Sequence, residues 1–208
     1  MNVFKHGKIT LIHGDCMEYL TGLEDKSFDL AVVDPPYRDS NQPTKDMRAN
    51  GQMKSLEGRP SGDYWEHLRR ASSEQIIWGA NNFQLPQFMG FIVWEKLSIS
   101  ENFTMSMAEI AAISSGLGTT SKIYRQAPQG GKLGRIHPTQ KPVKLYQWIY
   151  ANYAKTTDRI LDTHLGSGSS AIAAHYAGLE FVGIELDADY YAAAVERFKR
   201  ETAQEALF

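Results

Sequence analysis

Short apolar runs alternate along this chain with longer stretches whose apolar residues recur at helical spacing. The short runs predict strands at residues 9–13, 28–33, 75–78, 91–94, 108–113, 122–125, 159–161 and 180–184. The longer stretches predict helices at residues 16–23, 142–154 and 169–176 and from residue 188 onward. Asp15 precedes the first helix as a capping residue, and Pro142 stands at a first helical position. Strands that alternate with helices indicate a doubly wound α/β sheet.

Two segments depart from this pattern. Residues 38–62 are rich in Gly, Pro, Asn and Lys, have no period, and are too long for an ordinary connection. Residues 122–144 carry six cations and no carboxylate, although the whole chain has a net charge of −2. Such asymmetry fits either a cationic arm that faces a polyanion or a loop whose charges are merely solvated.

Composition indicates an ordinary soluble protein. The 208 residues are 42% hydrophobic and 22% charged, which suits a single domain with a substantial core. The single cysteine, Cys16, leaves no internal disulfide, and the six histidines show no metal-ligand spacing. The N-terminus has no apolar signal core and no run is long enough to span a bilayer, so we expect a cytoplasmic protein without a metal.

Asp34-Pro35-Pro36-Tyr37 follows the apolar run 28–33 directly. Open α/β sheets bind their ligands at the carboxyl ends of their strands, which is where these four residues are expected. The two prolines stiffen the backbone and leave its carbonyls as outward acceptors. A rigid carboxylate, a fixed carbonyl and an aromatic ring suit a planar base with an amino group. A simple strand-end turn fits the four residues about as well.

A glycine-rich loop, Asp162 to Ala171, lies between a predicted strand and a predicted helix. Gly166 and Gly168 permit a tight turn and a close approach to a ligand, and Glu185 ends the next strand at the spacing of an acid that binds a ribose. This order favours a nucleoside-containing cofactor over a structural turn. A nicotinamide enzyme usually places its glycine loop first, whereas here the loop comes late, which favours S-adenosylmethionine.

Together the motifs resemble those of the permuted β group of DNA amino methyltransferases over nearly the whole chain. The matching segments are 11–16, 34–37, 76–83, 91–96, 137–142 and the glycine loop. The resemblance implies a Rossmann-like, circularly permuted methyltransferase sheet, S-adenosylmethionine as cofactor, and site-specific methylation of adenine N6 in double-stranded DNA by base flipping. It also suggests a restriction-modification or phage enzyme and a homodimer. Cytosine N4, RNA adenine and, more remotely, a catalytically silent nucleic-acid-binding module are the alternatives.

The resemblance also implies the roles of individual residues. The Asp34 carboxylate and the Pro35 carbonyl would accept the amino hydrogens, and Tyr37, after Pro36, would stack on the base. Glu185 would hold the ribose, and Asp15 and Cys16 the adenine. The remaining cofactor-binding residues would be Thr139, Lys141, Asp162, Gly166, Ser167, Gly168 and Ser169, most of them near the methionine carboxylate.

The chain departs from the family in two ways. Thr163 and His164 stand where the family often has Pro and Phe, and no length remains for a large target-recognition domain. We therefore expect segments 38–62 and 122–135 to be mobile and to face DNA.

Overall fold

A computed structural model describes residues 2–37, 40–41, 56–86, 88–102, 106–128 and 135–203. Most of the predicted DNA-facing segment 38–62 and the middle of segment 122–135 lie outside these residues.

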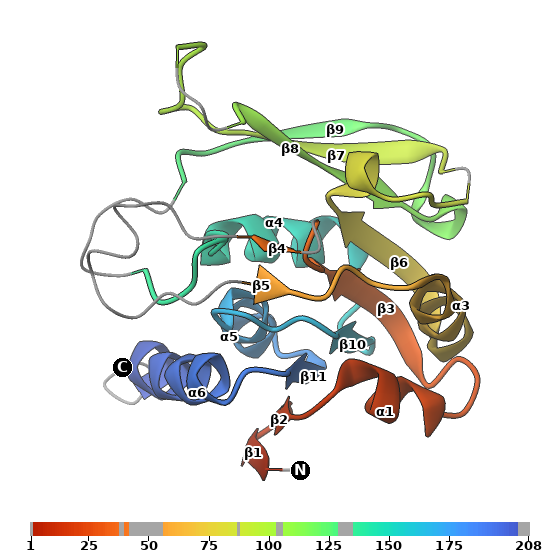
Figure 1. Cartoon of the computed structure of the whole chain (residues 1–208), viewed down its shortest axis with the longest axis vertical. Helices are drawn as coiled ribbons and strands as arrows, with labels where there is room; N and C mark the ends of the chain where they lie inside the picture. Colours follow the sequence, from red (N-terminus) through yellow and green to blue (C-terminus); the bar gives the residue numbers. More distant parts are fainter. Residues whose placement is uncertain are drawn as a thin grey trace.

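A nine-stranded mixed sheet forms the centre of the described molecule, in the order β1-β2-β11-β10-β3-β6-β8-β7-β9 (Figure 1). The strands are β1 (Asn2–His6), β2 (Ile9–His13), β3 (Phe28–Val33), β6 (Ser72–Trp78), β7 (Gly90–Glu95), β8 (Ala108–Ile113), β9 (Lys122–Arg125), β10 (Arg159–Asp162) and β11 (Glu180–Glu185). The five strands from β2 to β6 in this order are parallel, so their carboxyl ends meet at one edge. A separate antiparallel pair joins β4 (Ser40–Asn41) to β5 (Leu56–Glu57).

Helices cover both faces of the parallel strands. They are α1 (Cys16–Thr21), α3 (Gly62–Ala71), α4 (Val143–Tyr153), α5 (Ser169–Tyr176) and α6 (Ala188–Thr202), with 3-10 turns at Ala80–Asn82 and Ser115–Leu117. Alternate residues of β3 point to opposite faces of the sheet. Val32 packs in one core cluster with α4, α5 and α6, and Val33 packs in the other with α1 and α3. None of the helices in the described ranges has the length and apolar character needed to cross a membrane.

The predicted strands and helices are all present, with ends that shift by a few residues. Asp15 caps α1, because its Oδ1 accepts a hydrogen bond from the Met17 amide at 2.7 Å. The sheet is less regular than a fully parallel one, since β8 runs antiparallel to β6 and β7.

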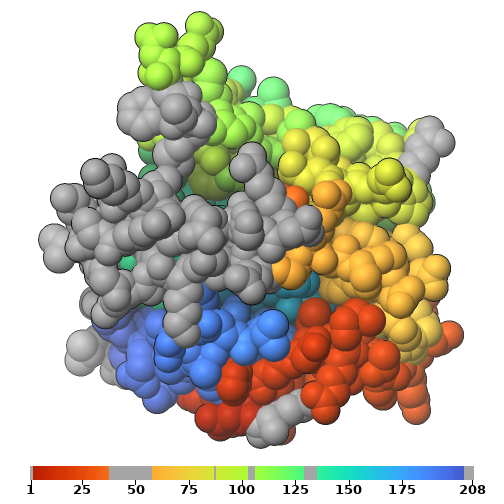
Figure 2. All heavy atoms as spheres, in the orientation of Figure 1, coloured from red at the N-terminus to blue at the C-terminus, as the bar shows by residue number. Residues whose placement is uncertain are grey.

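Four of the described strands and helices were not predicted: β1, α3 and the short strands β4 and β5. Strand β1 is an exposed edge strand with little apolar signal. Helix α3 buries Tyr64, Trp65 and Leu68 beneath a polar outer face, and its first residue lies in the stretch that looked aperiodic. Figure 2 shows that α3 and the residues before it, in orange, border the N-terminal elements in red.

Candidate active site

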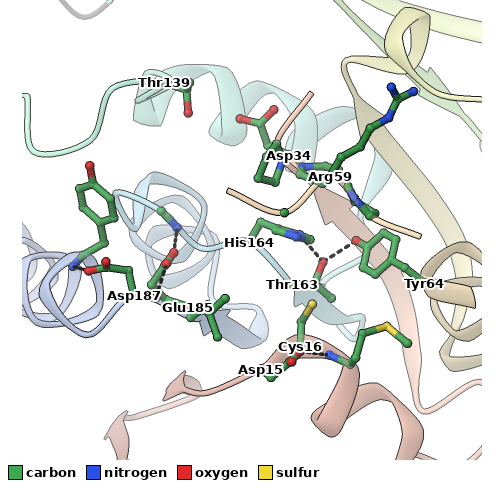
Figure 3. Close-up of a pocket in the computed structure, with 18 of the residues that line it drawn as sticks. Asp15, Cys16, Asp34, Arg59, Tyr64, Thr139, Thr163, His164, Glu185 and Asp187 are labelled. Atoms are coloured by element: carbon green, nitrogen blue, oxygen red, sulfur yellow. Dashed lines mark hydrogen bonds between the residues drawn. The ribbon is translucent and has the colours of Figure 1, made fainter. Parts of the chain in front are cut away.

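A cavity of about 590 Å³ opens at the carboxyl edge of the parallel strands. Of the predicted site residues, Asp15, Cys16, Asp34, Pro35, Pro36, Tyr37, Thr139, Gly166 and Glu185 all line it. Asp34 and Glu185 approach from different sides, and His164 lies between them (Figure 3). The structure thus brings together residues that are far apart in the sequence, because their strands end at the same edge.

Tyr37 orients the Asp34 carboxylate. Its hydroxyl donates to Asp34 Oδ1 at 2.7 Å, and its ring meets Phe83 edge-on at 6.0 Å between centroids. Burial raises the pKa of Tyr37 well above its ordinary value, so the hydroxyl keeps its proton and remains a donor. Gly79 makes room for the ring: its φ is +69°, and a Cβ there would lie 2.1 Å from Tyr37.

Lys141 lies beside Asp34 and bonds the carboxylate oxygen that Tyr37 does not, and its ammonium also lies 3.4 Å from the Tyr37 hydroxyl. Its ammonium donates to Asp34 Oδ2 and to Glu109 Oε2, the second at 3.0 Å, and its side chain is only 2% exposed. Glu109, on β8, also pairs with Lys96 at 2.5 Å. Lys141 is not among the residues that line the cavity: its ammonium contacts Asp34 and Glu109, and its carbonyl accepts a hydrogen bond from Ser169 of the glycine loop.

Burial and charge act in opposite directions on these groups. Burial raises the pKa of Asp34, while the Lys141 cation opposes the rise. Burial also favours the neutral form of Glu109, but the Lys141 and Lys96 cations outweigh it and lower its pKa to about 2. The pKa of Lys141 is raised because Asp34 and Glu109 overcome the effect of burial. Glu109 is therefore ionised and Lys141 protonated at neutral pH.

Glu185 is held at the other end of the cavity by backbone amides. Its Oε2 accepts from the Gly166 amide at 2.8 Å and its Oε1 from the Asp187 amide at 3.0 Å. Burial raises its pKa. Gly166 and Gly168 have φ values of +53° and +75°, the left-handed conformation that glycine adopts readily and that lets the loop turn tightly.

Asp162 lies beneath the glycine loop and does not line the cavity. Its Oδ1 accepts from the His164 amide at 3.0 Å and its Oδ2 from the Ser170 hydroxyl at 2.5 Å. Burial raises the pKa of Asp162 to about 7. The carboxyl group therefore braces the loop from below.

Ser167, Gly168 and Ser169 also shape the loop from outside the cavity. The Ser169 hydroxyl donates to the Lys141 carbonyl at 2.7 Å, and the buried Arg197 donates to the Ser167 carbonyl at 2.9 Å. Arg197 therefore ties α6 to the loop, and Ser169 ties the loop to the segment before α4.

Comparison with known proteins decides the family. A family model described as DNA methylase, covering N6 and N4 enzymes, matches residues 47–196. The chain belongs to this DNA methylase family. The matched span lies downstream of Asp34 to Tyr37, so those four residues and their geometry are independent of the match.

Relatives of this DNA methylase extend over most of its length. A chain named YubD from Escherichia coli (strain K12) is 26% identical over 205 residues, covering 89% of this chain and 88% of YubD. The type II methyltransferase M2.DpnII of Streptococcus pneumoniae is 23% identical over 252 residues, covering 95% and 92%.

Two solved structures share the fold. The M1.HpyAVI–SAM complex superposes with a TM-score of 0.61 at 21% identity, covering 91% of this chain and 99% of that chain. The PvuII DNA methyltransferase, which is cytosine-N4-specific, gives 0.65 at 12% identity, covering 97% and 94%. They confirm the predicted Rossmann-like methyltransferase fold.

Sequence reasoning missed several residues of the methylase site. The Tyr64 and Thr163 hydroxyls lie 2.6 Å apart, and Thr163 Oγ1 lies 2.9 Å from His164 Nδ1. Thr163 and His164, which stand where the family often has Pro and Phe, therefore form one polar network with α3. Burial lowers the pKa of His164 to about 4, which leaves its ring neutral. The apolar spacing of Tyr64, Trp65 and Leu68 was the signal that would have revealed α3.

Glu109 and Lys96 were assigned only to distal strands, with no role in the site. A carboxylate inside an apolar strand and a lysine directly after another strand were the available signals, because buried charges need partners.

Proposed function

We propose that this DNA methylase transfers a methyl group from S-adenosylmethionine to the N6 amino group of an adenine flipped out of double-stranded DNA. The observation that carries the proposal is the position of Asp34. Tyr37 and Lys141 hold its two oxygens at one side of the cavity, and Glu185 lines another side of the same cavity. A fixed acceptor for an amino group and a fixed acceptor for a ribose thus share one cavity.

The cavity suits the cofactor chemically. Asp15, Glu185 and Asp187 line it, and carboxylates accept hydrogen bonds from ribose hydroxyls and favour a cationic ligand. Glu185 has already accepted one backbone amide on each oxygen, which leaves one lone pair on each for a ribose diol. When bound, S-adenosylmethionine supplies an electrophilic methyl group on a positively charged sulfur. M1.HpyAVI, which shares the fold, was solved as a complex with SAM, and this supports the same cofactor here.

The residues around Asp34 would act on the base by positioning and charge. An exocyclic amino nitrogen is a poor nucleophile because its lone pair is delocalised into the ring. With its hydrogens accepted by the Asp34 carboxylate and the Pro35 carbonyl, the nitrogen is drawn towards a tetrahedral shape with its lone pair directed at the methyl group. The proton becomes acidic only as the new bond forms, so Asp34 need not be a strong base beforehand.

Adenine is favoured by the residue at position 34, since the resemblance associates Asp rather than Ser there with adenine. Cytosine N4 is the second candidate, because the cytosine-N4-specific PvuII enzyme has the same fold. The preference for adenine therefore depends on a single side chain.

The product identifies the substrate. The protein would be incubated with S-adenosylmethionine labelled in the methyl group and unmethylated duplex DNA, and the DNA digested to nucleosides. We expect label in N6-methyladenine. Label in N4-methylcytosine would show that the target base is cytosine instead of adenine. Label only in an RNA sample run in parallel would contradict a DNA substrate. An Asp34→Asn variant, which keeps the size of the side chain, should incorporate little label.

A further inference from the structure

Four charged side chains form a largely buried row behind the Asp34 end of the cavity. Lys96, Glu109, Lys141 and Asp34 alternate in sign, and each contacts the next. They come from the ends of β7 and β3, from β8, and from the segment before α4. We call these four residues the ionic row.

The charges of the ionic row lie where their removal from water costs free energy. Lys141 is 2% exposed and Glu109 21% exposed, and the Lys141 ammonium also lies 5.2 Å from the Trp78 ring. Buried ion pairs rarely contribute much net stability, because desolvation offsets their attraction. The row ends on Asp34, which faces the cavity, and the Tyr37 hydroxyl lies within 3.4 Å of Glu109 as well.

We propose that Lys141 and Glu109 are positioning residues for methyl transfer: Lys141 fixes Asp34 as an ionised acceptor, and Glu109, paired with Lys96, limits how strongly Lys141 binds Asp34. This inference rests on the proposed function, because it gives Asp34 the role of amino-group acceptor.

The geometry gives each partner a separate task. Tyr37 occupies one lone pair of Asp34 Oδ1 and Lys141 one of Oδ2, so each oxygen keeps a lone pair for the base. A lysine bound to Asp34 alone would neutralise much of that acceptor's charge. The Lys141 ammonium also donates to Glu109 at 3.0 Å, so its positive charge is shared between two carboxylates. Asp34 therefore keeps more negative charge with which to bind the amino group.

The two residues shift the ionisation of Asp34 in opposite directions. The Lys141 cation lowers the pKa of Asp34, and the Glu109 anion raises it. The other titratable groups around the row are Tyr37, Tyr146 and Asp162 near Asp34, Arg135 near Glu109, and His137 near Lys141. None of these residues is itself substituted in either variant. Lys141 and Glu109 act on the pKa of Asp34 with opposite sign, so opposite displacements of the acid limb can be attributed to the two substitutions.

The test compares Lys141→Met and Glu109→Gln with wild type, and with Lys144→Met as a matched control on the exposed side of α4. kcat is measured from pH 5 to 9 at saturating cofactor and DNA, and the Kd of S-adenosylhomocysteine by calorimetry. We expect kcat at pH 7 to fall by about 100-fold in Lys141→Met and by about tenfold in Glu109→Gln. The acid limb of the kcat profile should move to higher pH in Lys141→Met and to lower pH in Glu109→Gln.

The Kd of S-adenosylhomocysteine separates this role from the one implied by the resemblance. It should stay within about threefold of wild type, because neither side chain lines the cavity. A large loss of affinity with unchanged kcat in Lys141→Met would place Lys141 at the methionine carboxylate and overturn the inference. The inference would also be overturned if the acid limbs of the kcat profiles of the two variants both stayed at the wild-type pH, or both moved in the same direction.

A folding defect is distinguished by Lys141→Arg, which keeps the cation and should restore the wild-type acid limb even where kcat stays low. If the wild-type protein transfers no methyl group to DNA, the proposed function fails and the inference fails with it. If wild type is active and the limbs do not separate, the inference alone fails.

Discussion

At the residue scale, Asp34 is fixed by the protein's own side chains. Donors from two different parts of the chain hold its two oxygens, Tyr37 from the same turn and Lys141 from the segment before α4. An acceptor that is already oriented needs little reorganisation when the base binds, which is the condition under which electrostatic stabilisation is most effective.

Asp34→Ala should abolish methyl transfer and leave cofactor binding nearly intact. The lost acceptor is used mainly in the transition state, so the barrier should rise by about 3–4 kcal/mol or more. Single-turnover methyl transfer and calorimetry with S-adenosylhomocysteine measure the two effects. Because the substitution leaves Lys141 with Glu109 as its remaining carboxylate partner, a thermal melt should accompany them. Near wild-type transfer would contradict the assignment of Asp34.

Asp162 gives a prediction about stability and pH. Its pKa is raised to about 7 in the folded protein, so between about pH 4 and pH 7 it is protonated when folded and ionised when unfolded. The free energy of unfolding therefore falls as pH rises through this window, by about 4 kcal/mol in all at about 1.4 kcal/mol per pH unit. Asp162→Asn stays neutral and can keep both hydrogen bonds.

The melting temperature should therefore fall less between pH 5 and pH 8 in Asp162→Asn than in wild type. Asp63→Asn, at an exposed position in the first turn of α3, is the control and should follow wild type. Equal pH dependence in all three proteins would show that Asp162 titrates normally.

At the element scale, the turn after β6 determines where Tyr37 lies. Gly79 has a left-handed backbone, and its missing side chain leaves the space that the Tyr37 ring fills. The turn after β6 is thus matched to a residue in the turn after a different strand, β3.

Gly79→Ala should displace Tyr37 and lower kcat by tenfold or more, since Asp34 loses the donor on Oδ1, about the effect of one oriented hydrogen bond. Gly178→Ala is a close control: its φ is +67°, like the +69° of Gly79, but a Cβ there would meet nothing within 4 Å. Both variants incur the backbone strain of about 1 kcal/mol. A Gly79→Ala enzyme as active as Gly178→Ala would show that Tyr37 does not orient Asp34.

Elements could be predicted from the sequence wherever their pattern is local. Strand β3 and helix α5 have the predicted bounds because an apolar run and a glycine loop define them without help from elsewhere. Helix α3 could not be placed as easily, because its apolar side is narrow and its start is polar. The link from Lys141 to Glu109 depends on how β8 packs next to β6, and no local pattern contains that information.

At the scale of the whole molecule, positive charge is uneven. The described part of segment 122–135 begins as edge strand β9, where Lys122 bonds Asn152 at 2.9 Å and Arg125 pairs with Glu95 at 2.7 Å. Both pairs are exposed, and such surface pairs are weak enough to exchange for phosphates.

Replacing Lys122, Arg125, Lys132 and Arg135 together with Gln should weaken binding to every DNA sequence similarly. Lys132 lies outside the described residues. If each cation neutralises one phosphate, the log–log salt slope of binding should become less steep by about 3.6. Fluorescence anisotropy across a salt series measures the slope, and Lys199→Gln with Arg200→Gln on α6 is the control. An unchanged slope would mean that DNA binds elsewhere.

The short segment from His137 to Lys141 touches both halves of the cavity. The His137 ring lies next to Gly166 of the glycine loop and 4.5 Å from the Tyr190 ring, while the Lys141 ammonium holds Asp34. Ser169 of the loop also bonds the Lys141 carbonyl. A base that engages Asp34 therefore acts on the same short segment that abuts the cofactor loop. Under the proposed function, this shared segment predicts coupling between unlike ligands: whatever factor DNA imposes on cofactor affinity, the cofactor must impose on DNA affinity.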